Sequence, residues 1–600
     1  MATKTSNKTN KNAKTNNTAE IYTPYTVKKL TDMVWEGKYL LPSIQRKYVW
    51  KEKDIICLFD SLMLGYPIGS FLVWQSNNKT ILSNKYYMCL HHIDFNKAFT
   101  EHEVEAAGRK NNRMLLLDGQ QRLTSLCVGL NGSITKNNHT SESYLYFNHT
   151  VNPKLNTTTF NKSSYEFKFL TTDENKKYNW FKVNDIIDPK SIKTINKNKT
   201  YTPTEVNNLK RLYDIIHKNK NLFVYELPKD SSAYDVLSVF SRLNKQGQSL
   251  STVNLIFSVI CAHWGNARDE IDNLLTNING CNFKFFEDYI IKVALACIDL
   301  PISLNLEKFT KDDVDKIVNN WDLIKRSIQL TIDLLQKEYY MTKHHILSEN
   351  ALVPVNYYIY KKLVDKQKNN TKGDYLSYGY SRILNNDDIL NIKKFLVAVQ
   401  TNKIFENAPN KVAESLCKHI DKKYSINKSR FKLEMFDDWD DKGKKIVVNK
   451  ELVESYFSFK KGSPKAFLVL SLLYPKVMIN PTNKHQDHAH PKILFSDKNL
   501  KTIIPDQTSD EWKFYKKEYD LLANIHFMEG DENQSKNDTP LDQWLESDKV
   551  RINEIACLPF VNDVLVNKDF SCYNIKNFKN FIDERKKLIR EKLYKELNVK

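Results

Sequence analysis

Three histidines fall within six residues in the segment HQDHAH, residues 485–490. Hydrolysis of a phosphodiester needs a base that activates water, and a divalent cation can stabilise the leaving oxygen. His488 can act as that base. Asp487 and Asn533 offer the hard oxygen ligands that magnesium prefers. These residues therefore predict a magnesium-dependent hydrolytic site near the C-terminal end of the sequence.

Further polar residues around this segment can assist the same chemistry. Asn524 can orient the imidazole of the base. Lys536, one helical turn beyond the predicted asparagine ligand, and Lys492 can meet a DNA phosphate. His490 and His526 are left over and are expected to face phosphate. The alternative interpretation is a histidine-rich surface loop, or an imidazole cluster that takes zinc or nickel by accident.

A second candidate site follows the apolar run RMLLL, where the sequence continues as DGQQRLTSL. The pattern predicts a strand, a tight turn and the first turn of a helix. Free amides at a helix N-terminus favour an anionic phosphate, glycine lets the backbone approach closely, and arginine can fork onto phosphate oxygens. The aspartate can hold a metal or orient a water, and either glutamine can position an attacking water. The alternative is an Asp-Gly turn that merely caps a helix. The candidates are Asp118, Gly119, Gln120, Gln121 and Arg122.

Two more segments each place an arginine in a compact motif, although arginine is far rarer than lysine in this chain. In LPSIQRKYVW, Gln45 and Arg46 precede aromatic residues that can support a base or a sugar by stacking. In FSRLNKQGQSL, Arg242 and Asn244 are polar groups in an apolar context. By itself, the first of these is better explained as an aromatic anchor at a helix entry.

Together, these three segments resemble the N-terminal domain of GmrSD-type restriction enzymes, with its PxxQRxYxW, DGQQR and FxRLNxxGxxL elements in the same order. The resemblance covers roughly residues 21 to 260 and implies a fold similar to ParB and sulfiredoxin. It also implies binding and hydrolysis of a nucleoside triphosphate, with no base preference. The nucleotide-binding residues that it implies are Gln45, Arg46, Asp118, Gly119, Gln120, Gln121, Arg122, Arg242 and Asn244; of these, Asp118, Gln120 and Gln121 are also the catalytic candidates.

The histidine-rich segment resembles an HNH nuclease, the ββα-metal fold, with DHxxP, an asparagine on the second strand and N-x-x-K opening the helix. It is also similar to the C-terminal domain that accompanies the GmrSD N-terminal domain in fused enzymes. The separation of His488 from Asn533 is longer than in compact HNH motifs. An insertion around 496–519 is therefore expected to loop out.

The patterning predicts a multidomain α+β protein with a disordered tail over 1–20. An α/β domain over 21–264 precedes a helical connector over 265–410, and the nuclease domain occupies 411–600. Apolar runs predict strands at 69–75, 113–117, 144–147 and 222–227. Helical periodicity predicts helices at 51–64, 253–264, 321–338, 387–400, 466–474 and 577–597.

Composition limits the remaining possibilities. Hydrophobic residues make up 41% and charged residues 27% of the chain, which is typical of globular proteins and not of collagen or disordered chains. No stretch approaches the roughly 18 apolar residues of a spanning helix, so we expect no membrane insertion and a cytoplasmic location. The nine cysteines are scattered without a C-x-x-C pair, which favours neither disulfides nor a cysteine zinc site. A net charge of +19 suits a polyanionic partner, although an AT-rich coding sequence would also inflate lysine.

We therefore interpret the sequence as a type IV restriction-like endonuclease, dependent on DNA modification and regulated by nucleotide, that acts against modified phage DNA. Its cofactors would be Mg²⁺ and a nucleoside triphosphate, and a homo-oligomer is left open. The main alternative is a ParB-like DNA-binding or nucleotide-sensing adaptor with an inactive HNH domain. A third interpretation is a nuclease in which DGQQR binds only DNA phosphates.

Overall fold

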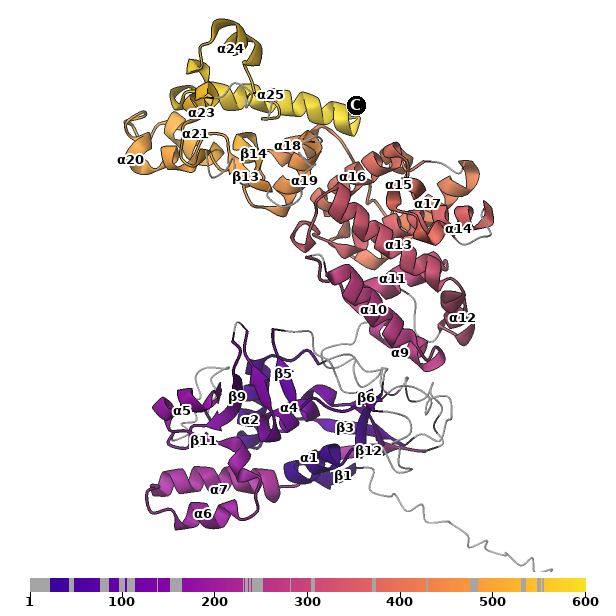
Figure 1. Ribbon diagram of the computed structural model, residues 1–600, viewed down its shortest axis with the longest axis vertical. Coiled ribbons are helices and arrows are strands. Elements are labelled where there is room, and N and C mark those ends of the chain that lie inside the picture. Colours follow the sequence, from indigo (N-terminus) through magenta and orange to yellow (C-terminus); the bar gives the residue numbers. More distant parts are fainter. Residues whose placement is uncertain are drawn as a thin grey trace, which may run out of the picture. The chain divides into compact units, whose positions relative to one another are not determined.

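The computed structural model describes residues 22–42, 48–75, 86–96, 103–104, 114–137, 139–151, 165–229, 231, 236, 239, 252–280, 282–303, 308–369, 374–427, 430–474, 484–529, 536–547, 552 and 555–599. The chain divides into two compact units, Met1–Arg268 and Asp269–Lys600. Figure 1 colours them along the sequence, from indigo through magenta and orange to yellow. The first unit is built on β-sheet and the second is mainly helical, so the predicted mixed α+β class is confirmed.

Within the described part of the first unit, seven strands form one mixed sheet in the order β1-β12-β3-β7-β2-β4-β6. The pairs β12–β3 and β2–β7 are parallel, and the other neighbours are antiparallel. The central strands β3 and β7 consist mainly of consecutive apolar residues, and the side chains of these residues are buried. The strand bounds are β1 Tyr22–Tyr25, β2 Tyr39–Pro42, β3 Ser70–Trp74, β4 Tyr86–Tyr87, β6 Glu103–Val104, β7 Met114–Asp118 and β12 Leu222–Leu227.

A second sheet in this unit has the order β10-β9-β8-β5, with β11 also paired to β9. It comprises β5 His92–Asp94, β8 Ser133–Thr135, β9 Glu142–Phe147, β10 Phe167–Leu170 and β11 Phe181–Lys182. The strands predicted at 69–75, 113–117, 144–147 and 222–227 are confirmed to within two residues at each end as β3, β7, β9 and β12.

Helices α2 and α4 pack against each other and supply part of the apolar core of the first unit. A Cβ on Gly129 of α4 would collide with the ring of Phe59 on α2, so glycine allows the two helices to approach closely. Gly65 ends α2 with a positive φ of 79°. The helices are α1 Val27–Trp35, α2 Glu52–Leu64, α4 Gln120–Asn131, α5 Thr172–Tyr178, η2 Val183–Ile186, α6 Ser191–Lys197, α7 Pro203–His217 and α9 Thr252–His263.

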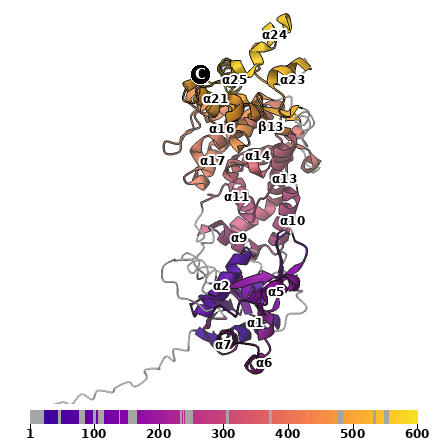
Figure 2. The ribbon, with the colours of Figure 1, turned by 90° about the vertical axis from the view of Figure 1, so that its left-hand side faces the viewer.

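In the second unit, α14 is the central helix and packs on α11, α13 and α17, which Figure 2 shows in magenta to orange. The buried amide of Asn356 joins three helices, because it accepts from Thr331 Oγ1 at 2.9 Å and donates to Tyr289 Oη at 2.7 Å. The elements of this part are α10 Ala267–Asn279, α11 Glu287–Cys297, α12 Lys311–Asn319, α13 Trp321–Asp333, η4 Leu334–Glu338, η5 Lys343–His345, η6 Glu349–Ala351, α14 Val353–Asn369, η7 Asp374–Ser377, α15 Tyr380–Ile383, α16 Asn386–Thr401, η8 Lys403–Phe405, α17 Pro409–Asn427 and η9 Leu433–Phe436.

The C-terminal part of the second unit surrounds a strand pair, in which β13 runs antiparallel to β14. The long helix α25 packs on α18, α19 and α21. Its buried Arg585 donates to the carbonyls of Ala523 at 2.9 Å and Ile525 at 3.1 Å, which fixes the start of β14. The elements are α18 Lys450–Tyr456, α19 Pro464–Leu473, β13 Lys484–His488, η11 Lys492–Phe495, α20 Asp497–Leu500, α21 Asp510–Glu518, η12 Leu522–Asn524, β14 Ile525–Glu529, α23 Leu541–Ser547, α24 Val561–Asn567, η14 Ser571–Tyr573, η15 Ile575–Asn577 and α25 Phe578–Leu597.

The segment between β13 and β14 differs from the expected open loop. It contains α20 and α21, and the aromatic residues Trp512 and Tyr515 are buried. Tyr515 Oη also donates to the carbonyl of Ile575 at 3.2 Å. The insertion is therefore part of the fold around the strand pair, since its apolar side chains need a surface to pack on. Among the helices of the described residues, none is long and apolar enough to cross a membrane.

A short helical turn far upstream packs on the helix that precedes this strand pair. His345 of η5 stacks on Phe467 of α19 with ring centroids 3.6 Å apart. Burial, and next the neighbouring His344, lowers the pKa of His345 from its ordinary 6.5 to about 4. His345 is therefore neutral at neutral pH, and its Nδ1 accepts from the Thr342 amide at 3.0 Å.

This histidine predicts acid sensitivity of the second unit. Because the folded protein binds a proton at His345 more weakly than the unfolded chain, stability is lost as pH falls from about 6.5 toward 4. His345→Phe keeps a ring on Phe467 but removes the titration. The loss of unfolding free energy between pH 7 and pH 5 should be smaller in the variant by on the order of 1 kcal/mol, after allowance for partial exposure. Urea denaturation at both pH values measures this, and an equal loss in the two proteins would contradict it.

Candidate functional site

The Asp-Gly turn of the first unit has the predicted local structure. Strand β7 ends at Asp118, Gly119 has a φ of 93°, and α4 begins at Gln120. A Cβ on Gly119 would collide with the ring of Phe71, so both the backbone conformation and the lack of space require glycine. The turn thus presents the first amides of α4 directly after the carboxylate of Asp118.

The guanidinium of Arg122 is held over this turn. Its Nη2 donates to Asp118 Oδ2 at 2.9 Å and its Nη1 donates to the Ile68 carbonyl at 2.6 Å. It also lies over the Phe71 ring, 5.2 Å from the centroid. Both charged side chains remain partly exposed, at 20% for the arginine and 27% for the aspartate. Arg122 therefore orients Asp118, and a bound phosphate would have to use its remaining N–H groups or replace one of these acceptors.

The two glutamines of the motif are buried. Gln121 Oε1 accepts from the backbone amides of Val49 at 2.8 Å and Trp50 at 3.3 Å. Nearby, the hydroxyls of Tyr48 and Ser125 share a hydrogen bond of 2.8 Å. Gln121, which was expected to position water, thus joins the end of the PxxQRxYxW motif to α4, and two of the three N-terminal motifs meet. Gln45 and Arg46, and likewise Arg242 and Asn244 of the third motif, lie outside the described residues.

In the second unit, the predicted base His488 lies at the end of β13 and is only 4% exposed. Its Nε2 is 3.1 Å from Asp520 Oδ1, and its Nδ1 is 3.3 Å from Lys461 Nζ. Because an ammonium group can only donate, Nδ1 is the acceptor and the ring proton is on Nε2, donated to Asp520. Burial, and next Lys461, holds the pKa of His488 below its ordinary value, against the two aspartates that raise it. The imidazole is therefore neutral and has the form that a base requires.

Asp487, the predicted metal ligand, is bound by two lysines. Its Oδ1 is 3.0 Å from Lys461 Nζ and its Oδ2 is 2.9 Å from Lys536 Nζ. Although burial raises the pKa of Asp487, the Lys536 ammonium and other cations hold it well below its usual range. Lys536 also donates to the His488 carbonyl and is fully buried. The structure therefore places Lys536 beneath the site as a partner of the carboxylate, not at a surface where a phosphate could reach it.

Asn524 is fully buried and serves the main chain. Its Oδ1 accepts from the His490 amide at 2.9 Å, and its Nδ2 donates to the carbonyls of His490 at 3.1 Å and Tyr519 at 2.7 Å. It thus fixes the backbone just after β13, while Asp520 is the side chain that orients the imidazole. The expectation for Asn524 is corrected accordingly, because its amide satisfies buried backbone groups that would otherwise lack partners.

The spare histidines are corrected as well. His490 is fully buried with its ring edge-on to Phe578 and Phe581, and burial lowers its pKa to about 3. His526 is 1% exposed. Neither can face a phosphate. Lys492, in contrast, is exposed at the start of η11.

The described residues do not by themselves make a magnesium site. Within the described ranges, no group of three His, Cys, Asp or Glu side chains is arranged to hold a metal ion. Both oxygens of Asp487 already accept from ammonium groups. Asn533 lies outside the described residues. A cation at this place would have to share Asp487 with the two lysines.

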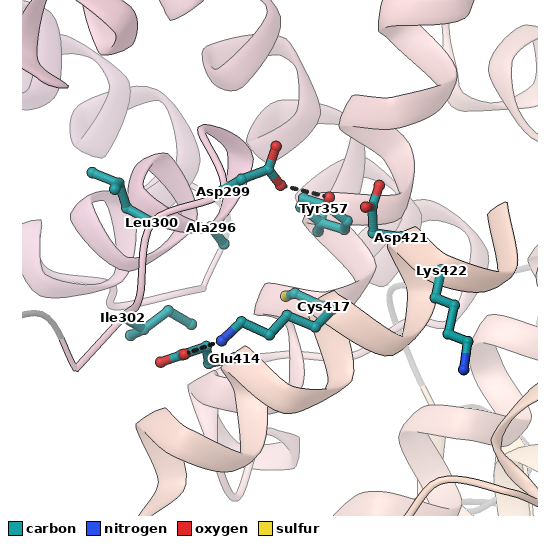
Figure 3. A pocket seen from close by; sticks show the side chains of 10 residues that line it. Ala296, Asp299, Leu300, Ile302, Tyr357, Glu414, Cys417, Asp421 and Lys422 are labelled. Atoms are coloured by element: carbon teal, nitrogen blue, oxygen red, sulfur yellow. Dashed lines mark hydrogen bonds and ion pairs between the residues drawn. The ribbon is translucent and has the colours of Figure 1, made fainter. Parts of the chain in front are cut away.

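A separate cavity of about 390 Å³ lies among α11, α14 and α17. Figure 3 shows Tyr357 at one wall, where its hydroxyl donates to Asp299 at 2.8 Å. The other carboxylates pair with lysines, Glu414 with Lys418 at 2.6 Å and Asp421 with a lysine of α14 at 2.7 Å. No residue that lines this cavity belongs to the four motifs, so it adds nothing to either candidate site.

Sequence reasoning missed two residues of the His488 site. Asp520 directly follows the insertion and Lys461 lies in the loop before α19, so neither has a fixed spacing to the HQDHAH segment. Only the antiparallel pairing of β13 with β14, and the packing of the loop on it, brings them to the histidine. The sequence offers one signal for Asp520. This acidic residue lies four positions before Asn524, the residue that precedes β14, and is therefore close to the second strand of the predicted site.

These features define a two-unit α+β protein with an Asp-Gly turn site in the sheet unit and a histidine–carboxylate site in the helical unit. The model of the GmrSD restriction endonuclease N-terminal domain matches residues 27–261. The chain therefore has the N-terminal domain of the GmrSD-type restriction enzyme family, and the resemblance of residues 21 to 260 to this domain is confirmed.

A curated relative gives a weaker comparison. An uncharacterized protein of Methanocaldococcus jannaschii is 27% identical over 258 residues, which covers 38% of this chain and 40% of that protein. The match thus spans less than half the length of the relative.

The contact of Arg122 with the backbone at Ile68 can be tested through Gly69. Gly65 and Gly69 both have positive φ, 79° and 83°, so alanine has a backbone penalty at either position. Only at Gly69 would the new Cβ also collide with Arg122 Nη1; at Gly65 it meets open space. Gly69→Ala should therefore lower the free energy of unfolding by on the order of 1 kcal/mol more than Gly65→Ala, as measured by urea denaturation.

The control is to make Gly65→Ala and Gly69→Ala in a protein that also has Arg122→Ala. Without the guanidinium, the difference in stability between the two alanine variants should become smaller by on the order of 1 kcal/mol, since that part of the penalty comes from the displaced arginine. A difference that is unchanged in that background would show that the arginine contact is not its cause.

Proposed function

We propose that this protein is a DNA endonuclease of the restriction type, that His488 is the base that activates water, and that the N-terminal domain regulates cleavage through a nucleoside triphosphate. The observation that carries the proposal is the imidazole of His488, which is neutral and has its Nε2–H directed at Asp520. A base needs a lone pair that can take a proton and a group that stabilises the cation formed. Nδ1 has the lone pair, which accepts from Lys461 until water replaces that contact, and Asp520 supplies the stabilising charge.

In the proposed reaction, Nδ1 of His488 takes a proton from water and the resulting hydroxide attacks the phosphorus of a DNA phosphodiester. The bond from phosphorus to the leaving sugar oxygen breaks, and that oxygen takes a proton from solvent, so that a phosphomonoester and a hydroxyl end result. His488 then returns the proton of the attacking water to solvent. Asp520 stabilises the imidazolium through the Nε2 hydrogen bond. Buried Asn524 and Lys536 keep the end of β13 in place during this step.

We also propose that cleavage requires magnesium, for which Asp487 and Asn533 are the candidate ligands. Chelation tests this requirement directly. Excess EDTA should stop cleavage and added magnesium should restore it, whereas undiminished cleavage in EDTA would exclude a metal requirement. The net charge of +19 supports DNA as the partner, and the family resemblance supports modified phage DNA as the substrate.

Nucleotide regulation rests on the geometry of the Asp-Gly turn, where the first amides of α4 and Arg122 lie beside Asp118. A helix N-terminus of this kind favours a phosphate. Because this turn and the His488 site belong to different units, the nucleotide would act by a change of state with a typical coupling of about 5- to 150-fold. The direction of this effect on the cleavage rate is an outcome of the test.

Two other functions are the alternatives to a nucleotide-regulated nuclease. One is a non-catalytic adaptor, and the other is a nuclease that does not hydrolyse nucleotide. Phosphate release and DNA cleavage should be measured separately, on matched modified and unmodified phage DNA, with and without each nucleotide. Arg122→Ala should make cleavage insensitive to nucleotide without abolishing it. Identical nucleotide responses of wild type and this variant would exclude the turn as the sensor.

The role of His488 predicts a large loss of cleavage on substitution. His488→Ala should reduce the cleavage rate by about 10² to 10⁴, the usual contribution of a general base, with nucleotide hydrolysis nearly unchanged. Asp520→Asn should also slow cleavage, because an amide can hold the ring but cannot stabilise the imidazolium by charge. Gel assays of plasmid nicking and linearisation measure the rates.

Thermal unfolding of both variants serves as the control for folding. Cleavage by pure, folded His488→Ala at the wild-type rate would show that the nuclease site is elsewhere, and wild-type cleavage by Asp520→Asn would remove the charge-stabilising role.

A further inference from the structure

Lys461 is placed at the His488 site by a segment outside the HNH-like pattern. It lies in the loop between α18 and α19, and its Nζ is 3.0 Å from Asp487 Oδ1 and 3.3 Å from His488 Nδ1. The ammonium therefore covers the nitrogen that has to accept a proton from water, while it pairs with the neighbouring carboxylate.

The backbone of this loop is fixed on both sides of the site. The Lys461 amide donates to the Asp520 carbonyl at 3.0 Å, within a β-bridge between Lys460 and Leu521. The Gly462 amide donates to Gln486 Oε1 at 2.8 Å. Since the loop is bound both to β13 and to the segment before β14, the position of the ammonium follows from the fold and not from a freely rotating surface side chain.

The two lysines on Asp487 differ in access to solvent. The Lys536 side chain is fully buried, whereas that of Lys461 is 31% exposed. A polyanion that approaches His488 can therefore contact only Lys461 of this pair. An anionic phosphate oxygen is a stronger acceptor for an ammonium group than a neutral imidazole nitrogen, because the attraction between opposite charges adds to the hydrogen bond.

We propose that Lys461 binds the DNA phosphate at this site. When DNA is present, the Lys461 ammonium exchanges its hydrogen bond to His488 Nδ1 for one to a phosphate oxygen, and Nδ1 then becomes accessible to water. The inference rests on the proposed nuclease function. No covalent bond changes in this step, since one hydrogen bond of the ammonium is exchanged for another. Asp487 keeps its contact with Lys536 throughout, so the carboxylate does not become an unpaired buried charge.

The chain supplies a matched control one residue away. Lys460 is exposed and belongs to the same loop, where its described role is the backbone bridge to Leu521. Lys460→Met and Lys461→Met remove the same charge from nearly the same place. General electrostatic attraction for DNA would be reduced equally in both, whereas a specific phosphate contact would be lost only in Lys461→Met.

Binding of a short DNA duplex is measured against salt concentration in the His488→Ala background, where cleavage does not interfere. Lys461→Met should reduce the slope of log affinity against log salt by about 0.9, the value for one phosphate contact, and Lys460→Met should change it less. In the otherwise wild-type protein, Lys461→Met should lower the cleavage rate by about 10- to 100-fold, and Lys460→Met should leave it near wild type. If circular dichroism shows Lys461→Met to be unfolded, Lys461→Gln replaces it with the same expectations.

The outcomes separate this inference from the function on which it rests. Equal effects of the two methionine variants would overturn the inference alone. A loss of cleavage in Lys461→Met with an unchanged salt slope would also overturn it, because the lysine would then support the site without touching phosphate. Cleavage that His488→Ala leaves intact would overturn the proposed function and the inference together.

Discussion

The pairing of one buried carboxylate with two ammonium groups determines the arrangement of the C-terminal site. Asp487 is enclosed between Lys461 and Lys536, and a buried charge of this kind is tolerated only with such partners. Because the lysines come from segments on either side of β13, their pairing fixes where three parts of the chain meet. The position of His488, the next residue, then follows: its ring has an aspartate at one nitrogen and a lysine at the other.

The sheet unit uses polar motif residues in a comparable way. Gln121 satisfies two backbone amides of the PxxQRxYxW segment, and Arg122 satisfies both a carboxylate and a carbonyl. Residue types that suggest direct contact with a ligand thus hold the loops that surround the Asp-Gly turn. These hydrogen bonds restrict loops that have no apolar core of their own, which is compatible with the phosphate-binding role proposed for the turn.

Much of the fold follows from local sequence. The strands β3, β7 and β12 and the helices α2, α16 and α25 were predicted because apolar periodicity and glycine positions act over a few residues. The chemistry of the site is less local. Asp520 and Lys461 reach His488 through strand pairing across an insertion, and sequence spacing has no information on that pairing. Spacing also predicted a phosphate contact for Lys536. It could not show that this lysine lies on the buried side of the Asp487 carboxylate, because that position depends on how distant segments pack.

The stack of His345 on Phe467 has a practical consequence for dissecting this protein. The turn η5 also contacts the loop that contains Lys461, since His344 Nε2 lies 3.4 Å from the Gly462 carbonyl. A fragment cut at residue 411, between the connector and the nuclease domain expected from the sequence, would leave this turn on the other piece. The face of the Phe467 ring that His345 covers would then be exposed to water, and the loop would lose one of its supports. Expression of the complete second unit, from residue 269 onward, keeps both contacts within a single polypeptide.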